Sequence, residues 1–260
     1  MAKAGGRYGL DAFRHVAFDD IGSTNTECLA RARAGEAGLL WVTAARQTSG
    51  RGRRGRAWTS ETGNLYSSLL LIDPAPMERV ASLPLAVAVA VYDAVKAVLP
   101  PGAGLLQVKW PNDILIDRAK TCGILLEGEM LPDGRHALVI GIGINIRHMP
   151  DSAPYGVTRL VDHGAAISPD ELFAHLYRSM ALALESWDEG RGTARIVERW
   201  REIACGIGEK ITVNLPDRSL QGIFAGIDDN GLLLLDMGAE MGDGQVRPIA
   251  AGDVFFTRTE

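Results

Sequence analysis

Apolar and polar residues alternate in two ways along this chain, and together the two patterns predict a mixed fold. Short runs rich in aliphatic and β-branched residues predict strands at residues 14–18, 39–45, 64–72, 105–110, 113–116, 121–129 and 137–146. Longer stretches with a helical spacing of apolar residues predict helices at residues 26–34, 85–99, 168–187 and 194–204. We therefore expect an α/β (α+β) fold in which helices pack on a mixed, mostly antiparallel sheet.

The pattern changes after Cys205. Short alternating runs at residues 210–215, 220–227 and 232–236 are separated by turn clusters such as residues 228–231. This spacing is typical of a small β-barrel. We predict two domains, at residues 1–205 and 206–260.

Composition and charge argue against several classes of protein, among them membrane proteins and general nucleic-acid binders. The chain has 260 residues, of which 47% are hydrophobic and 23% charged, an ordinary balance for a globular protein. The sequence has no signal-peptide pattern and no uncharged apolar stretch that could span a membrane, and its three cysteines match no disulfide or zinc pattern. We expect a cytoplasmic protein with no membrane partner. A net charge of -5 argues against a general nucleic-acid binder.

Positive charge is concentrated in residues 46–58, the arginine loop. Five arginines lie between Arg46 and Arg56, and residues 37–60 contain no carboxylate. Glycines at positions 50, 52 and 55 free the backbone to fold around a ligand, and guanidinium groups bind phosphates and carboxylates in a fork geometry. The loop therefore predicts a site for a small anion such as a phosphate. On its own, the segment fits a solvated basic loop or an RGG-type RNA contact equally well.

Several polar residues beside the predicted elements are further candidates, and each has a structural alternative. Ser23 and Thr24 precede the first helix, where either can cap the helix or bind a ligand. Lys120 ends a predicted tight turn at residues 117–120, where an isolated lysine is usually solvated. Residues that can equally serve as turn or strand-end caps are Asn112, Asp113 and Asn145.

Four blocks of sequence occur together and in one order. They are Gln47 with residues 50–56 (Gly-Arg-Gly-Arg-Arg-Gly-Arg), residues 109–113 (Lys-Trp-Pro-Asn-Asp), residues 120–127 (Lys-Thr-Cys-Gly-Ile-Leu-Leu-Glu) and residues 141–145 (Gly-Ile-Gly-Ile-Asn). In these blocks, and from residues 23–25 to the C-terminal module, the chain resembles the biotin protein ligase family. The resemblance implies a catalytic domain followed by an SH3-like barrel. It also implies a two-step reaction, in which biotin and MgATP form biotinyl-5'-AMP and a lysine of a biotin carboxyl carrier domain then takes the biotin.

The resemblance implies roles for single residues as well. Lys120 and Arg53 are implied to stabilise the negative charge that builds up during adenylation. Asp113 is implied to orient or deprotonate the amine of the carrier lysine. The residues implied to bind biotin are Ser23, Thr24, Gln47, Gly50, Arg51, Arg53, Lys120 and Gly123. The residues implied to bind ATP are Arg53, Arg56, Trp58, Asn112, Lys120 and Asn145. Mg²⁺ is expected mainly on the ATP phosphates, with Asp113 as an additional candidate ligand.

One departure from the family pattern, and one comparison within the family, bear on these expectations. Cys122 stands where the family usually has glycine or alanine, and a cysteine is only slightly larger. Family members that also repress transcription carry a winged helix-turn-helix before the catalytic domain, whereas some dozen residues precede Arg14 here. We therefore expect no nucleic-acid partner, and a monomer or homodimer that modifies a carrier protein.

Three other functions compete with this interpretation. A protein that only senses biotin would keep Ser23, Thr24 and Gln47 but would not need Lys120. A lipoate ligase or octanoyltransferase has a related catalytic domain and also modifies a carrier lysine, but residues 50–56 and 109–113 disfavour it. An RGG-type nucleic-acid-binding protein would need aromatic residues between the arginines and a wider basic surface, and the sequence has neither.

Overall fold

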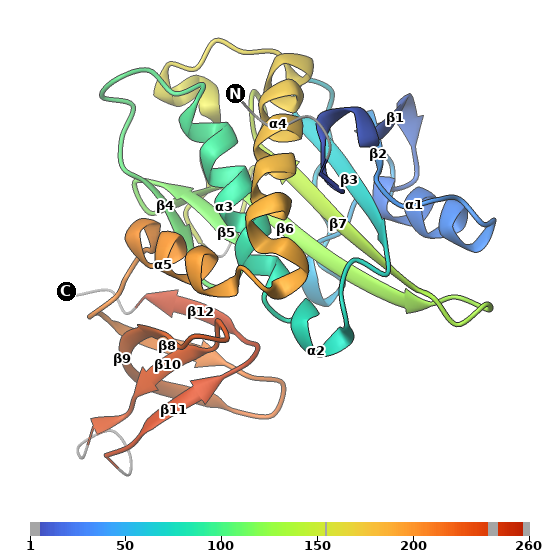
Figure 1. Cartoon of the computed structure of the whole chain (residues 1–260). Coiled ribbons are helices and arrows are strands. Elements are labelled where there is room, and N and C mark those ends of the chain that lie inside the picture. The colour runs from blue at the N-terminus through green and yellow to red at the C-terminus, as the bar shows by residue number, and fades with distance from the viewer. Residues whose placement is uncertain (1–5, 154, 239–243, 257–260) are drawn as a thin grey trace.

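The computed structural model describes residues 6–153, 155–238 and 244–256. Within these residues, seven strands form one sheet in the order β1-β2-β3-β7-β6-β5-β4 (Figure 1). β1 and β2 run parallel, and the other neighbouring strands of this sheet run antiparallel. The strands are β1 (Arg14–Ile21), β2 (Leu40–Gln47), β3 (Leu65–Ile72), β4 (Leu106–Lys109), β5 (Asp113–Ile116), β6 (Ala119–Met130) and β7 (His136–Ile144). The predicted mixed, mostly antiparallel sheet is confirmed.

Helices cover both faces of this sheet. They are α1 (Thr24–Arg33), α2 (Met77–Val80), α3 (Leu83–Lys96), α4 (Pro169–Trp187) and α5 (Thr193–Ile203). α1 packs on one face over a small apolar cluster, and α3, α4 and α5 enclose the main core on the other face (Figure 1). The alternation along β3 shows this directly, because Leu69 and Leu71 belong to the main core whereas Leu70 belongs to the cluster under α1.

The turn before β6 is shorter than the sequence predicted. Asp117 and Arg118 have left-handed backbone angles, with φ of 47° and 68°, and they make the turn between β5 and β6. β6 then begins at Ala119, so Lys120 lies in a strand and not in the turn. A strand fixes the direction of this lysine side chain, which matters for the site.

The C-terminal part forms a separate five-stranded antiparallel sheet in the order β11-β10-β9-β8-β12. Its strands are β8 (Lys210–Asn214), β9 (Ser219–Ile227), β10 (Leu233–Asp236), β11 (Val246–Ile249) and β12 (Asp253–Phe256). The predicted C-terminal β domain is confirmed, although the apolar pattern did not predict β11 or β12. This sheet lies beside α5 and the β4–β5 hairpin (Figure 1), where Trp110 Nε1 donates to the carbonyl of Gly231 at 3.1 Å.

Residues 1–5 of the first predicted domain and residues 257–260 of the second lie outside the described residues. None of the described helices is long and apolar enough to cross a membrane.

Candidate active site

A cavity lies where the large sheet, the arginine loop and the C-terminal sheet meet. Its walls come from the start of α1, the end of β2, the arginine loop, the β4–β5 turn, the middle of β6 and β7, and β12. The predicted site residues that line it are Ser23, Thr24, Gln47, Arg51, Arg53, Arg56, Trp58, Asn112, Asp113, Lys120 and Gly123. The fold therefore brings residues from distant segments into one site.

One end of the cavity carries a chain of hydrogen bonds between uncharged groups. Gln47 Oε1 accepts from the backbone N–H of Thr24 at 2.9 Å and from the Thr24 hydroxyl at 3.1 Å, while Gln47 Nε2 donates to Ser60 Oγ at 3.1 Å. Ser68 Oγ lies 2.7 Å from Thr24 Oγ1 and 2.6 Å from Asn25 Oδ1. This end offers both donors and acceptors of hydrogen bonds to a small polar ring.

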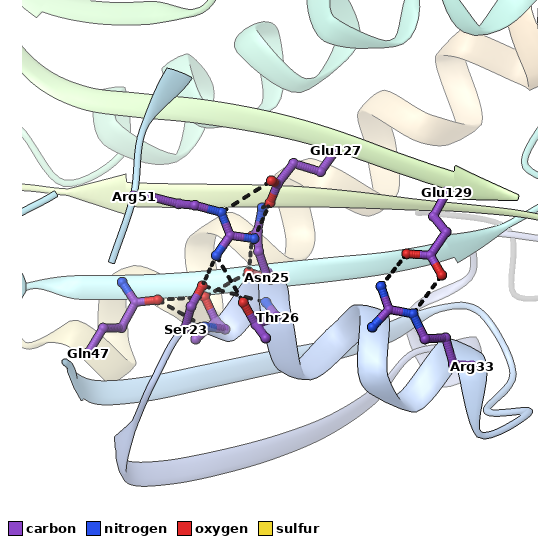
Figure 2. A network of polar contacts seen from close by, with 10 residues as sticks. Ser23, Asn25, Thr26, Arg33, Gln47, Arg51, Glu127 and Glu129 are labelled. Carbon is purple, nitrogen blue, oxygen red and sulfur yellow. Dashed lines mark hydrogen bonds and ion pairs between the residues drawn. The ribbon is translucent and has the colours of Figure 1, made fainter. Parts of the chain in front are cut away.

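A charged group continues this network at the rim of the cavity, as Figure 2 shows. The guanidinium of Arg51 forms two hydrogen bonds to the carboxylate of Glu127, at 3.2 and 2.8 Å, and the same carboxylate accepts from Asn25 Nδ2 at 2.7 Å. Arg51 Nη1 also donates to Thr26 Oγ1 at 2.9 Å and lies 3.4 Å from Ser23 Oγ. Ser23 in addition caps α1, so its structural and ligand-facing interpretations are compatible.

Lys120 supplies a fixed positive charge inside the cavity. Its Nζ lies 2.7 Å from Asp113 Oδ1 on the neighbouring strand β5, and its side chain is only 15% exposed. The ammonium also stands 5.6 Å from the ring centre of Trp58 and 5.5 Å from that of Tyr155. Burial is the largest single influence and lowers the pKa of Lys120, but the charge and hydrogen bond of Asp113, with Tyr155 and Cys122, together exceed it, so the pKa is raised. Lys120 therefore stays protonated and acts as a cation, not as a base.

Glycines form the floor of the cavity under Trp58. Gly123 of β6 and Gly143 of β7 stand opposite each other in the ladder. A β-carbon at Gly143 would lie 2.6 Å from the indole, and one at Gly123 would lie 2.8 Å from it. The missing side chains thus leave space for a flat group, which the Trp58 indole occupies in this structure. The indole Nε1 is buried and has no hydrogen-bond partner among the described residues.

The other end of the cavity is cationic. Arg53 Nη1 donates to Asn112 Oδ1 at 3.2 Å, and Asn112 Nδ2 donates to the carbonyl of Ile124. Arg53 and Arg56 both face the carboxylate of Asp253, at 3.6 and 2.6 Å. Lys109 and Lys120 also line the cavity, so four cations stand in this part of the wall beside the two carboxylates of Asp113 and Asp253.

Two of the predicted contacts do not line this cavity. Gly50 packs inside the arginine loop, where a β-carbon would lie 2.6 Å from Ser60 Oγ. Asn145 is buried, and its amide donates to the carbonyl of Thr158 at 3.2 Å, which suits a structural cap at the end of β7. The proposed biotin contact of Gly50 and the ATP contact of Asn145 thus receive no support from their positions.

Sequence reasoning assigned no role to several residues that line the cavity. Asn25 belongs to the family block at residues 23–25, but only the structure links it to Ser68 and Glu127. Tyr155 and Asp253 lie outside every block, and no local pattern marks them.

The described residues contain no group of three or more His, Cys, Asp or Glu side chains that could hold a metal ion. The Asp113 carboxylate is already paired with Lys120, so a metal on Asp113 would have to compete with that ammonium. The donor set fits a metal that arrives with phosphates better than a resident metal.

Comparisons with known proteins show which family the chain belongs to. The model of the biotin/lipoate A/B protein ligase family matches residues 19–145, and that of the biotin protein ligase C terminal domain matches residues 206–257. A biotin-[acetyl-CoA-carboxylase] ligase of Paracoccus denitrificans is 36% identical over 243 residues, which cover 90% of this chain and 97% of that protein. The chain belongs to the biotin protein ligase family. A second biotin-[acetyl-CoA-carboxylase] ligase, from Mycobacterium tuberculosis, is 34% identical over 91% of this chain and 86% of its own length.

Solved biotin protein ligases share the fold of this family member. The enzyme of Aquifex aeolicus in complex with biotin and ATP has a TM-score of 0.77 and 25% identity, with 95% of this chain and 99% of that chain covered. The enzyme of Leishmania major in complex with biotinyl-5-AMP has a TM-score of 0.62 and 25% identity, with 92% and 99% covered. The expectation of a biotin protein ligase with a C-terminal domain is therefore confirmed.

Proposed function

We propose that this protein is a biotin-[acetyl-CoA-carboxylase] ligase that activates biotin with ATP and transfers it to one lysine of a carrier domain. The observation that carries the proposal is a single cavity with an uncharged hydrogen-bonding end and a cationic end. Biotin has a ureido ring that needs both donors and acceptors, and a carboxylate that must meet a phosphate. The two ends of the cavity match these two ends of the substrate.

The ureido ring of biotin fits the uncharged end. Thr24 and Gln47 supply hydroxyl and amide groups there, and Asn25 extends the network towards the rim. The thiophane ring and aliphatic tail would then lie along the glycine floor and the β6 segment at Ile124 and Leu125, which also line the cavity. This orientation directs the carboxylate towards Lys120 and the arginines.

The first step joins two anions, so fixed cations are needed. A carboxylate oxygen of biotin attacks the α-phosphorus of MgATP, and the bond to pyrophosphate breaks. Two unit charges of like sign 4 Å apart repel by roughly 4 kcal/mol at an effective dielectric of 20. Lys120, Arg53 and Arg56 line the cavity where they can offset this repulsion, with Mg²⁺ entering as part of the nucleotide substrate.

The second step transfers the acyl group. The amine of the carrier lysine attacks the acyl carbon of biotinyl-5'-AMP, AMP leaves, and the amine loses a proton. We assign Asp113 to orienting this amine or accepting its proton, because its carboxylate lies in the cavity wall and its side chain is 22% exposed.

We also propose that the catalytic domain comprises residues 1–205 and the C-terminal domain residues 206–260. We expect the protein to be cytoplasmic and to be a monomer or a homodimer.

The arginine loop suits this function better than it suits nucleic-acid binding. Each of its five arginines has a carboxylate within 4.0 Å, from Asp20, Glu127 or Asp253. A polyanion gains affinity from many lysine or arginine contacts spread over a surface, whereas three of these five arginines converge on the single carboxylate of Asp253. We therefore expect duplex DNA to bind weakly and with a strong dependence on salt concentration.

Exchange of label between pyrophosphate and ATP tests the first step. We expect exchange that depends on biotin and does not occur with lipoate or octanoate as the acid. Exchange with lipoate or octanoate and none with biotin would instead support a lipoate or octanoate ligase.

Glu127 offers a prediction on substrate binding. The change Glu127→Gln keeps the shape of the side chain but removes the charge that holds Arg51 and Asn25 at the rim. We expect the KM for biotin in the adenylation assay to rise about fivefold, which corresponds to ~1 kcal/mol for a partly screened contact. The kcat and the KM for ATP should change little.

Glu129→Gln is the matched control. Glu129 lies two residues further along β6, where it pairs with Arg33 and not with a residue that lines the cavity (Figure 2). An equal rise in the KM for biotin in both variants, or a fall in kcat alone, would contradict the assignment of Glu127.

A further inference from the structure

A short segment at residues 156–158 holds the backbone of Lys120. The Lys120 N–H donates to the carbonyl of Gly156 at 2.8 Å, and the Thr158 N–H donates to the carbonyl of Lys120 at 2.9 Å. These two hydrogen bonds form a parallel bridge between Lys120 and Val157. Because both backbone polar groups of Lys120 are paired in this bridge, the segment helps to fix the point from which the lysine side chain extends.

Thr158 is itself held through its backbone and its side chain. The residue is only 8% exposed, and its carbonyl accepts from Asn145 Nδ2 at 3.2 Å. Its hydroxyl oxygen lies 2.8 Å from His163 Nε2. Asn145 directly follows the last residue of β7, so Thr158 is tied both to the end of the large sheet and to His163.

His163 ties this cluster to a third part of the chain. It ends a 3-10 helix at Leu160–His163, and its Nδ1 lies 2.9 Å from the carbonyl of Ala103, in the connection between α3 and β4. A carbonyl can only accept, so Nδ1 carries the hydrogen, and Nε2 of the neutral ring then accepts from the Thr158 hydroxyl. The imidazole therefore orients the side chain of Thr158.

These groups stand behind the cavity and not in its wall. Thr158, His163 and Ala103 do not line the cavity, whereas Lys120 does. Any contribution of the imidazole or of the Thr158 hydroxyl to the reaction must therefore act through a residue that does reach the substrates. The bridge at Val157 leads directly to Lys120.

We propose that Thr158 and His163 are positioning residues for adenylation: the hydrogen bond between them holds the bridge at Val157 and thereby the backbone of Lys120. This inference rests on the proposed role of Lys120 in forming biotinyl-5'-AMP. A fixed cation stabilises a transition state according to its distance from the developing charge. A small displacement of Lys120 should therefore slow the chemical step while the substrates still bind.

Biotin-dependent pyrophosphate exchange by Thr158→Val tests this proposal first. Valine keeps the shape of the side chain and removes the hydroxyl. We expect kcat to fall about fivefold, the scale of one buried hydrogen bond, with little change in the KM for biotin or ATP. His163→Ala should lower kcat to a similar extent. Thr158→Ser keeps a hydroxyl and should regain most of the lost rate.

The decisive comparison repeats Thr158→Val and His163→Ala in a Lys120→Ala background. If the two residues act through the Lys120 side chain, neither substitution should slow the residual exchange further once that ammonium is gone. An equal further fall in this background would show that they support the site in general, and it would overturn the proposal. A normal kcat in both single variants would overturn it as well.

Thr43→Val is the matched control. Thr43 makes the same kind of contact, because its Oγ1 lies 2.8 Å from His15 Nε2, but this pair joins β2 to β1 and neither residue lines the cavity. Pyrophosphate exchange by Thr43→Val should match that of the unaltered protein. A loss equal to that of Thr158→Val would count against a specific role for the Thr158 hydroxyl.

Amide hydrogen exchange gives a readout that needs no catalysis. The amides at positions 120 and 158 form the bridge, so in His163→Ala their hydrogens should exchange about fivefold faster than in the unaltered protein. The amide of Ile140, in the middle of β7, should keep its rate. Unchanged rates at positions 120 and 158 would contradict the proposal. Because this readout is independent of the reaction, its failure is distinct from a failure of biotin-dependent pyrophosphate exchange.

Discussion

Replacing Lys120 with alanine is expected to slow biotin-dependent pyrophosphate exchange by about 30- to 1,000-fold, which corresponds to roughly 2–4 kcal/mol for one fixed electrostatic contact. The Lys120 ammonium is buried and paired with Asp113, so its position is set before the substrates bind. Negative charge on the carboxylate and the α-phosphate builds up only during adenylation, which is why the loss should appear in kcat and not only in KM.

Two controls separate this effect from a general loss of structure. Lys210→Ala removes an exposed lysine on β8 and should leave exchange unchanged. Thermal unfolding of Lys120→Ala should remain cooperative, because Asp113 keeps Lys109 as a nearby cation. Near-normal exchange by Lys120→Ala would show that this lysine does not stabilise the transition state.

Replacing Gly143 with alanine is expected to lower the free energy of unfolding by about 1–3 kcal/mol, the usual cost of overpacking. The new β-carbon would lie 2.6 Å from the Trp58 indole, so either the indole or the strand must move. Because Trp58 covers the glycine floor, the same change should weaken binding of biotinyl-5'-AMP.

Unfolding by denaturant measures the loss of stability in Gly143→Ala, and two further variants serve as comparisons. In a Trp58→Ala background the cost of Gly143→Ala should nearly vanish, because the clashing ring is gone. Gly156→Ala is the control substitution, since its β-carbon would come no closer than 3.6 Å to any neighbour. A cost that is the same with and without Trp58 would contradict the packing of this indole on the glycine floor.

Much of the fold could be predicted from the sequence because the relevant signals are local. The runs of the large sheet alternate or are continuously apolar, and the arginine loop concentrates glycine and charge within a dozen residues. The strand position of Lys120 could not be predicted, since the turn at Asp117 and Arg118 uses left-handed backbone angles that residues other than glycine adopt only occasionally.

The least predictable parts of the site come from contacts between distant segments. Asp253 meets Arg56 across 197 positions in the chain, and Glu127 meets Arg51 across 76. Nothing in the pattern around Asp253 distinguishes it from an ordinary residue at the start of a strand. The C-terminal sequence predicts a separate β domain, and nothing in its pattern indicates that this domain contributes to the wall of the cavity.

Transfer of labelled biotin to a purified biotin carboxyl carrier domain tests the central claim most directly. With ATP present, we expect one label per carrier domain, and none when the acceptor lysine of the carrier is changed to arginine. Labelled lipoate and octanoate should not be transferred. A carrier domain that stays unlabelled with biotin and ATP, or one that takes lipoate or octanoate instead, would contradict the account of this cavity as the site of biotin activation and transfer.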